Sequence, residues 1–586
     1  MRVMAQTILV LLVTAAPLAQ AQPSVSLPGP SGARSATAPP DTPPGDRDTD
    51  EVDLYIKTSM ARQHIPGLSL AVIRDGKIIK ARGYGHASVE LNVPARPETV
   101  YELASATKPF VAVAVMSLVQ DGKIGLEDKV SGFVEGAPDT WKDITIRHLL
   151  THTSGIGDPR REFPFDTAPE TIVRAAIEAP LNFTPGARWS YSNTGYVLLG
   201  MIVRKVSGKS FDAFLVERVF KPLGMGDTRH DSPDEIVPNR AIGYVWYGGG
   251  LHNGEFLKYQ MTHHGASGIL STALDLARWD AALSSDRLLA PSSKEAMWSR
   301  VKLRDGSTFG YGLGWFLEDV NGHRHIHHPG GAPGTAAIIS RYPDDRLTVI
   351  ILANGGAAYV QALDFGVAQR YIPGLVTRVV VKLDRALLDS YTGYYNAYGS
   401  QVLKVTREGD HLVLDDGGRL VNPFLPLSET NFVAEDADRG FTLTRTEKGE
   451  VSGMVLRLVA DKMPVQRIGP LFRSLEPQPD PDRARTRKVE AVLKAFAAGG
   501  KAVEEVSDVA PQARKDYSRG PSPELAGIRT ISFIAVQEVS DRNIERHGGK
   551  VARILYCRLL TDQAPRNVLV YLTADGLVTD QDVVGE

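Results

Sequence analysis

The amino-acid sequence predicts an α+β protein in which an antiparallel sheet flanked by helices lies beside a helical lobe, followed by a small β-barrel and a small α+β domain. Strand patterns open and close the first part of the chain while helical patterns fill its middle, which favours a sheet beside a helical lobe. Short strand patterns then recur between Tyr391 and Ile468, as in a barrel or sandwich. A helical pattern and three strand patterns end the chain.

Length and composition fit several globular domains. The 586 residues exceed the ~250–300 at which a single core stops growing. Hydrophobic residues make up 43% and charged residues 23% of the chain, as in ordinary globular proteins. We predict a signal peptide, a disordered linker, a main domain, a β-barrel domain and a small α+β domain at residues 1–21, 22–48, 49–375, 380–472 and 483–586, respectively.

The first residues have the pattern of an export signal. Arg2 is followed by the apolar stretch Ile8–Ala16 and by Ala19-Gln20-Ala21, which fits a cleavage site. The alternative, a membrane anchor or a buried first helix, is disfavoured because a bilayer span needs ~20 apolar residues. We therefore predict a periplasmic or secreted protein, cleaved near Ala21, with no transmembrane segment.

Charge and cysteine content argue against a nucleic-acid-binding protein, a disulfide-stabilised protein and a cysteine-dependent enzyme. The formal net charge of −2 gives no field that attracts nucleic acid, so we expect no nucleic-acid partner. Cys557 is the only cysteine, which rules out an intrachain disulfide bond. It lies in an apolar strand pattern, so we expect a small buried residue and not a nucleophile.

Turn and capping signals separate the elements of the main domain. Asp75-Gly76 predicts a hairpin, and the nearly continuous apolar run Pro109–Val119 predicts a buried helix that ends at Gly122. Thr272 and Asp275 are typical of a helix start. The other expected helices are Asp50–Gln63, Ile146–Leu150, Tyr196–Val206 and Arg485–Ala498; the expected strands are Leu68–Arg74, Lys77–Tyr84, Tyr311–Phe316, His323–His328, Ala336–Tyr342, Leu347–Leu352, Ile531–Val539, Val551–Leu560 and Val568–Leu572.

Ser105 and Lys108 precede the predicted buried helix. A serine hydroxyl needs a base before it becomes a nucleophile, and residues three apart on a helix share one face. Lys108 can therefore reach the oxygen of Ser105. The helix start also offers free backbone N–H groups that could bind an oxyanion.

Two further segments carry polar groups that suit the same chemistry. Tyr191 could accept a proton if an adjacent Lys108 ammonium lowered its pKa, and Asn193 could orient Lys108 or a substrate carbonyl. His328 ends a predicted strand, followed by Gly330 and Gly331, whose backbone could complete an oxyanion hole. Each segment alone is also compatible with an ordinary turn.

In order and approximate spacing, these motifs resemble those of the β-lactamase-related serine hydrolases, which include class C β-lactamases, D,D-peptidases and family VIII-type esterases. The resemblance covers roughly residues 50–374 and rests on Ser105-x-x-Lys108, Tyr191-x-Asn193 and His328-x-Gly330. The segment after it resembles the lipocalin-like β-domain that often follows such hydrolases. The resemblance implies an acyl-enzyme mechanism in which Ser105 attacks while Lys108 and Tyr191 shuttle protons, and it implies no cofactor.

One position departs from the lysine found in related motif sets. His328 carries no permanent charge at neutral pH, so it offers little to a substrate carboxylate. We therefore expect an ester or amide substrate, either a small molecule or peptide-like, and an esterase or amidase. The alternatives are a β-lactamase or D,D-carboxypeptidase, or a catalytically silent binding protein with the same fold. The oligomeric state stays open.

Other histidines are weighed as metal ligands or structural groups. His323, His325 and His327 alternate along one strand, but no carboxylate or cysteine at ligand spacing accompanies them in the sequence. We therefore expect a polar strand face and no metal. His148 and His152 are expected to brace a loop.

Overall fold

The structure is a computed structural model. It describes residues 50–586, apart from residues 160–166, 233, 248–249, 255–264, 377–378, 398–400, 416–421, 435–438, 458–461, 476–477, 543, 548, 563–564 and 585–586. The predicted signal peptide and disordered linker lie outside the described residues. No helix of the described part is long and apolar enough to cross a membrane.

A seven-stranded antiparallel sheet forms the centre of the first part of the chain. Its order is β11 (Phe316–Val320), β12 (His323–Ala332), β13 (Thr335–Tyr342), β14 (Leu347–Ala353), β1 (Gly67–Arg74), β2 (Lys77–Ser88) and β3 (Val93–Pro94). The predicted hairpin at Asp75-Gly76 joins β1 to β2. The N-terminal hairpin thus pairs with strands from the end of the domain, as the sequence predicted.

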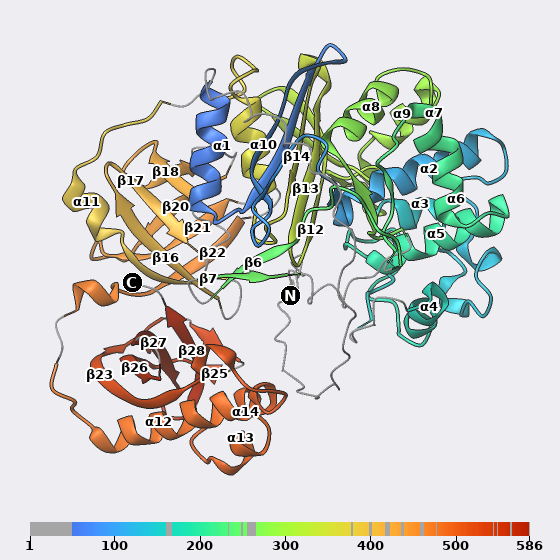
Figure 1. The fold of residues 1–586 in the computed structure, drawn as a ribbon. Helices are drawn as coiled ribbons and strands as arrows, with labels where there is room; N and C mark the ends of the chain where they lie inside the picture. Colours follow the sequence, from blue (N-terminus) through green and yellow to red (C-terminus); the bar gives the residue numbers. More distant parts are fainter. Residues whose placement is uncertain are drawn as a thin grey trace, which may run out of the picture.

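Both faces of the sheet are covered, which explains why its central strands are apolar throughout. Helices α1 (Glu51–Arg62) and α10 (Val360–Ala368) cover one face, and the helical lobe covers the other (Figure 1). Successive residues of a strand point to opposite faces, so Ile338 contributes to the first core and Ile339 to the second.

The helical lobe surrounds α2, the predicted buried helix. Its helices are α2 (Lys108–Gln120), α3 (Ile146–Leu150), α4 (Pro169–Ile177), α5 (Asn193–Ser207), α6 (Phe211–Leu215), α7 (Lys221–Leu223), α8 (Ala273–Leu283) and α9 (Pro291–Met297). All residues of α2 from Lys108 to Leu118 are buried. Gly122 follows with a φ of 71°, in the left-handed region, which suits a glycine after a helix. Thr272 caps α8 through a hydrogen bond from the Asp275 amide.

Small sheets complete the lobe and its edge. The pieces are β4 (Tyr101–Glu102), β5 (Arg229–His230) and β8 (Ile269–Ser271) in one sheet, β6 (Tyr244–Tyr247) with β7 (Gly250–Asn253), and β9 (Val301–Lys302) with β10 (Thr308–Phe309). Strand β4 leads directly into the segment that holds Ser105.

The predicted strand Tyr311–Phe316 is wrong. Strand β11 begins at Phe316, where the prediction ended, and Tyr311 only forms an isolated bridge to Phe316. The physical reason is a turn: Gly314 has a φ of 80°, so the chain bends before it enters the sheet. The next predicted strand, His323–His328, continues as β12 to Ala332.

An eight-stranded closed antiparallel barrel follows, in agreement with the predicted β-barrel. Its strands are β15 (Gly393–Ala397), β16 (Gln401–Glu408), β17 (His411–Asp415), β18 (Asn422–Pro426), β19 (Asn431–Ala434), β20 (Gly440–Arg445), β21 (Val451–Arg457) and β22 (Lys462–Gly469), preceded by α11 (Arg385–Ser390). Figure 1 shows the barrel on the side of the sheet that α1 and α10 cover.

The last part of the chain is a four-stranded sheet with three helices. It holds α12 (Arg483–Ala498), α13 (Lys501–Glu505), α14 (Pro511–Tyr517), β23 (Ile528–Glu538), β24 (Glu545–Arg546), β25 (Gly549–Lys550), β26 (Arg553–Thr561), β27 (Arg566–Leu572) and β28 (Val578–Val584). The predicted helix and three strands are present, while α13, α14, β24, β25 and β28 were not predicted. Cys557 is buried in β26, as expected.

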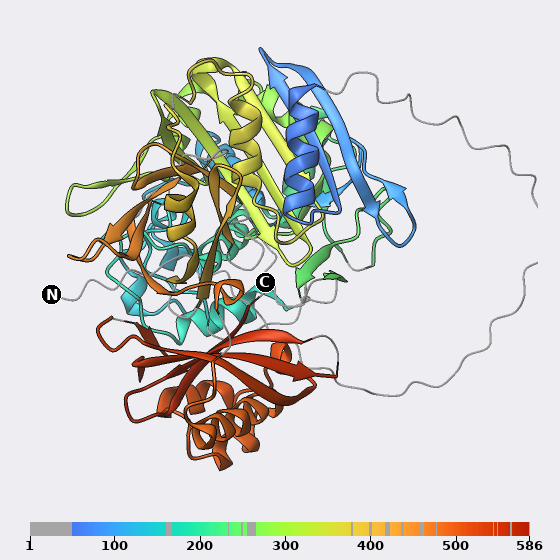
Figure 2. The same cartoon turned by 90° about the vertical axis from the view of Figure 1, so that its left-hand side faces the viewer.

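The barrel and the last part share an apolar cluster. Ile468 and Phe472 from the barrel side meet Ile534 and Tyr556 of the four-stranded sheet. The Arg542 guanidinium also donates to the carbonyl oxygen of Ile468 at 2.8 Å. Figure 2 shows the four-stranded sheet facing the barrel, with α12 to α14 on its outer side. These contacts join the two C-terminal parts of the chain.

Candidate active site

Ser105 lies in a tight turn between β4 and α2. The turn is a 3₁₀ helix, Ala104–Thr107, and Ala104 has a φ of 45°, a strained value for a residue with a side chain. Ser105 is partly exposed, whereas its neighbours on both sides are buried. The fold therefore holds one reachable hydroxyl in an otherwise closed segment.

Strand β12 packs closely against this turn at Gly330. A Cβ atom added at Gly330 would lie 1.9 Å from the carbonyl oxygen of Leu103 and 3.0 Å from the amide nitrogen of Ser105. Any side chain at this position would push the strand away from Ser105. Gly331, by contrast, is exposed, and an added Cβ atom would meet nothing within 4 Å. Gly330 thus allows β12 to lie close to the Ser105 turn, and Gly331 leaves open space next to β12.

Lys108 is fully buried next to Ser105. Its Nζ donates to Ser105 Oγ at 3.2 Å, to Asn193 Oδ1 at 2.9 Å and to the carbonyl oxygen of Ala266 at 2.8 Å. Burial lowers the pKa of Lys108 to about 7, although the charge of Asp158 acts in the opposite direction. A large fraction of Lys108 is therefore neutral at neutral pH and can accept a proton.

Tyr191 lies beside the same lysine. Lys108 Nζ is 4.7 Å from the centre of its ring, and the ring centres of Tyr191 and His152 are 4.2 Å apart. Burial of the hydroxyl end raises the pKa of Tyr191, and a hydrogen bond with Ser105 only partly opposes this. The expected lowering of the tyrosine pKa by Lys108 is therefore wrong. Burial has the largest effect because it disfavours the charged phenolate, and the Asp158 charge acts in the same direction.

Asn193 is the first residue of α5, and Asp158 fixes it there. The Asp158 carboxylate accepts hydrogen bonds from the amide nitrogens of Asn193 and Thr194 and from the side chains of Ser192, Asn193 and Thr194. The two backbone amides are among the N–H groups that a helix start leaves without an intrahelical partner. Asp158 was not predicted as a site residue, because α5 begins three residues before the predicted helix and the role of the aspartate depends on where that helix starts.

His328 is buried and neutral. Its Nε2 is 3.0 Å from the Tyr311 hydroxyl and its Nδ1 is 2.7 Å from the carbonyl oxygen of Pro329. A carbonyl only accepts, so Nδ1 carries the proton and Nε2 accepts from Tyr311. Burial lowers the pKa of His328 well below its usual value, and the nearby Lys108 lowers it further. His328 thus offers no positive charge, in line with the sequence analysis.

Aromatic side chains stand beside Tyr191 and His328. Trp189 stacks on Phe309 with ring centres 4.2 Å apart, and Tyr311 meets Phe316 edge to face at 4.8 Å. Phe316 also lies 5.3 Å from the ring of His328. Trp189, Phe309 and Phe316 are partly exposed. We call these three residues together with Tyr311 the aromatic wall.

The remaining histidines separate into loop and strand groups. His148 Nδ1 accepts from the Thr145 amide and His152 Nδ1 from the Ser192 amide, as expected for groups that brace loops. On β12, the expected lack of a carboxylate partner is wrong. The neighbouring strand β11 brings Glu318 to His325 and His327, and this cross-strand pairing is invisible in the spacing along the chain.

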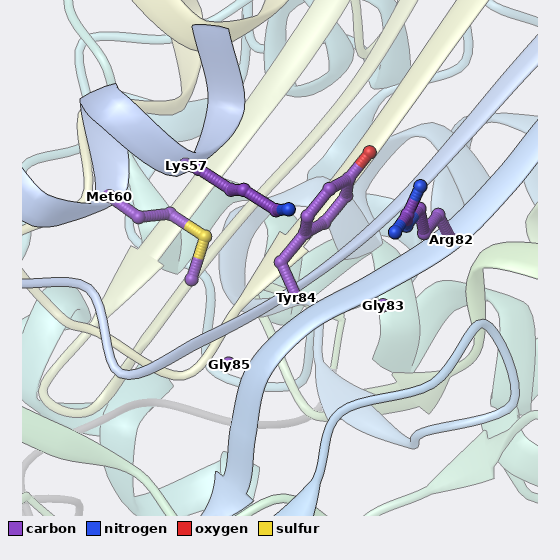
Figure 3. A pocket seen from close by; sticks show the side chains of 6 residues that line it. All are labelled: Lys57, Met60, Arg82, Gly83, Tyr84 and Gly85. Carbon is purple, nitrogen blue, oxygen red and sulfur yellow. The ribbon is translucent and has the colours of Figure 1, made fainter. Parts of the chain in front are cut away.

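A separate pocket lies between α1 and the sheet. It is formed by α1 and β2 and is lined by Lys57, Met60, Arg82, Gly83, Tyr84 and Gly85. Figure 3 shows these residues at the crossing of α1 over β2. None of the predicted site residues lines this pocket.

The fold and the cluster around Ser105 define a serine hydrolase with a β-lactamase type of fold. The family model described as Beta-lactamase matches residues 52–370, and the chain belongs to this family.

Relatives support the same assignment. Penicillin-binding protein 4* of Bacillus subtilis is 32% identical over 411 residues, which cover 63% of this chain and 90% of the relative. Protein flp of Staphylococcus aureus is 29% identical over 339 residues, covering 53% of this chain and 64% of the relative. Among solved structures, the octameric penicillin-binding protein homologue from Pyrococcus abyssi is similar with a TM-score of 0.52 and 26% identity, covering 71% of this chain and 99% of that chain.

Proposed function

We propose that the protein is an exported serine hydrolase that cleaves neutral ester or amide substrates through an acyl-enzyme. The observation that carries the proposal is the 3.2 Å hydrogen bond between Lys108 Nζ and Ser105 Oγ, made by a buried lysine whose pKa is about 7. A partly neutral lysine can remove the proton of a serine hydroxyl. Export rests on the apolar N-terminal pattern and predicts a periplasmic or secreted enzyme.

The proposed reaction has two steps. Ser105 Oγ attacks the substrate carbonyl while its proton passes to Lys108. Neutral Tyr191 then relays this proton from Lys108 to the leaving group. The leaving group departs with that proton, and an ester bond to Ser105 remains. Water then attacks the acyl-enzyme, gives up a proton through the same groups and releases the acid. The backbone N–H groups of Ser105 and Gly331 are proposed to bind the oxyanion.

The surroundings of Ser105 favour an uncharged, apolar acyl group. His328 is neutral and both of its ring nitrogens already have partners, so it gives a substrate carboxylate no counter-charge. The partly exposed rings of the aromatic wall provide apolar contact next to the site. Both features argue against a dedicated β-lactamase or carboxypeptidase.

A second candidate function is a peptidase acting on D-amino-acid peptides. It is favoured by one observation, the similarity to a relative named penicillin-binding protein 4* along 90% of that relative's length. Short-chain esters, D-amino-acid amides and a chromogenic cephalosporin, compared by kcat/KM, separate the two. The proposal expects the neutral ester or amide to be the better substrate, and a preference for the cephalosporin would contradict it.

The nucleophile is tested by covalent labelling. A fluorophosphonate probe should label the wild-type protein and fail to label Ser105→Ala, because the probe forms a bond only with an activated serine. Ser190→Ala, which changes a serine near Tyr191, is a matched control and should be labelled like the wild type. Equal labelling of wild type and Ser105→Ala would refute the assignment.

A further inference from the structure

Three potential metal ligands meet on the face of β12 that points away from the catalytic cluster. Glu318 of β11 is directly paired with His325 of β12, and His327 lies two residues further along. Alternate residues of a strand share a face, so His325 and His327 lie on one face and His328 on the other. One ligand atom from each of the three residues lies within 4.8 Å of the other two.

The spacing of these atoms fits a small tetrahedral ion. His325 Nδ1 is 3.3 Å from Glu318 Oε2, and His327 Nε2 is 3.2 Å from Glu318 Oε1. Zinc binds nitrogen and oxygen ligands at ~2.0–2.1 Å, so two ligands of a tetrahedral site stand ~3.3–3.4 Å apart. Both separations are close to this value, but they end at different oxygens of the Glu318 carboxylate, so the imidazoles must turn before both can share one ion with Glu318.

Ser340 and Asp364, which would not touch the ion, already orient His325. His325 Nε2 is 2.6 Å from Ser340 Oγ and 3.2 Å from Asp364 Oδ2, and Ser340 donates to the same aspartate at 2.8 Å. Ser340 and Asp364 therefore accept the Nε2 proton of His325, and without an ion Nδ1 donates to Glu318, so an ion at Nδ1 would displace that proton. Metal-binding histidines are commonly held in this way, with the nitrogen that does not bind the metal donating to a carboxylate.

His327 provides a second, independent observation. It is only 5% exposed, yet no hydrogen bond from a described residue satisfies either of its ring nitrogens. Its Nε2 is close to Glu318 but lacks hydrogen-bond geometry. A buried imidazole without a partner is costly, and a metal ion at Nε2 would remove that cost.

We propose that Glu318, His325 and His327 bind one divalent transition-metal ion of the zinc type, with water as the fourth ligand. The side chain of Glu318 is 21% exposed, so the cluster is not sealed from solvent. The two imidazoles stack at 4.2 Å and 12°, so binding requires them to rotate until both lone pairs converge. The ion fastens the edge strand β11 to β12 and supports Phe316, which stacks on His327 at 5.4 Å. It takes no part in the reaction at Ser105.

The test is zinc binding by the full-length protein after treatment with EDTA. Calorimetry and metal analysis should give one zinc per chain for the wild type. The zinc-loaded protein should melt at a higher temperature than the EDTA-treated protein. His327→Ala and Glu318→Gln should lose this site. Asp364→Asn should bind ten- to a hundredfold more weakly, as expected for an outer partner. The matched control is His323→Ala: His323 lies on the same strand face but is paired with Asp345 and should not matter.

Two outcomes would overturn the proposal. One is a wild type that takes up no more zinc than His327→Ala, which would mean that the cluster is held by protons and ion pairs alone. The other is equal loss of zinc in His323→Ala, which would place the ion elsewhere. If the ligand variants do not fold, the visible spectrum of cobalt added to the wild type decides. Tetrahedral bands are expected, and their absence contradicts the site.

Discussion

Two histidines on opposite faces of β12, His325 and His328, have opposite surroundings. His328 faces Tyr311 and Lys108, has both ring nitrogens satisfied, and is neutral because burial lowers its pKa. On the other face, burial also lowers the pKa of His325, but the hydrogen bonds and charges of Asp364 and Glu318 outweigh it and raise the pKa to about 9. Desolvation acts on both faces, so the carboxylates make the difference.

This difference separates two tasks within one strand. The face toward the helical lobe presents neutral groups near Ser105, which suits chemistry that depends on an uncharged lysine. The opposite face gathers carboxylates and histidines, which suits an ion. Both sets of groups can belong to one strand because successive side chains of a strand point to opposite faces of the sheet. The predictions below test how far the two faces act independently.

The largest effect is expected from the proton-transfer pair on the catalytic face. Lys108→Ala and Tyr191→Phe should each lower kcat/KM about a thousandfold or more, ~4 kcal/mol. The double variant should lose little more, since groups that act as one unit are not additive. Tyr196→Phe is the control, because its ring also lies near Lys108 while its hydroxyl binds a carbonyl oxygen. If the two single losses simply multiply, the shared role is wrong.

The next effect is the pH dependence of turnover. In the proposed reaction the neutral form of Lys108 is the base, so kcat/KM should fall as the pH drops below its pKa of about 7. At two units below that value the loss should be about a hundredfold. Asp158→Asn removes the charge that raises this pKa, so the acid limb should move to lower pH. If the acid limb of the pH profile stays in place in Asp158→Asn, the titrating group is not Lys108.

The sequence predicted most of the fold because its signals are local. A hairpin turn at Asp75-Gly76 and the apolar run of α2 depend on neighbouring residues only. The errors lie where distant contacts decide. The chain around Gly314 reads as a strand but bends against the α2 segment: a Cβ atom added there would lie 2.9 Å from Ala112. Strand β28 carries a polar sequence and is stabilised by pairing with β27.

The predicted site residues come together, but their environment was only partly predictable. The Lys108 hydrogen bonds to Ser105 and Asn193 follow from motifs that the sequence displays. The direction of the Tyr191 pKa does not, since it depends on burial, which spacing along the chain does not reveal. The same holds for Glu318, which reaches the histidines only through the register of two strands.

A smaller effect is expected from giving the catalytic face a charge. His328→Lys should favour substrates with a carboxylate by about five- to thirtyfold, ~1–2 kcal/mol, because the new ammonium can replace Nε2 beside Tyr311 and attract an anion. The measurement is kcat/KM for a cephalosporin divided by that for a neutral ester. His328→Gln, which adds no charge, should leave this ratio unchanged. An unchanged ratio in His328→Lys would mean that this position does not face the carboxylate.

The smallest effect is expected from removing metal. Ions held on the opposite face of β12 cannot reach Ser105, and the residues proposed for catalysis already supply a nucleophile, a base and oxyanion donors. Dialysis of the wild type against EDTA should therefore leave kcat/KM for a neutral ester within about threefold, ~0.7 kcal/mol, while the melting temperature falls. Adding zinc back should restore the melting temperature with no larger change in rate. Turnover that disappears with EDTA and returns with zinc would show that the two faces are coupled, and the metal would then belong to the mechanism.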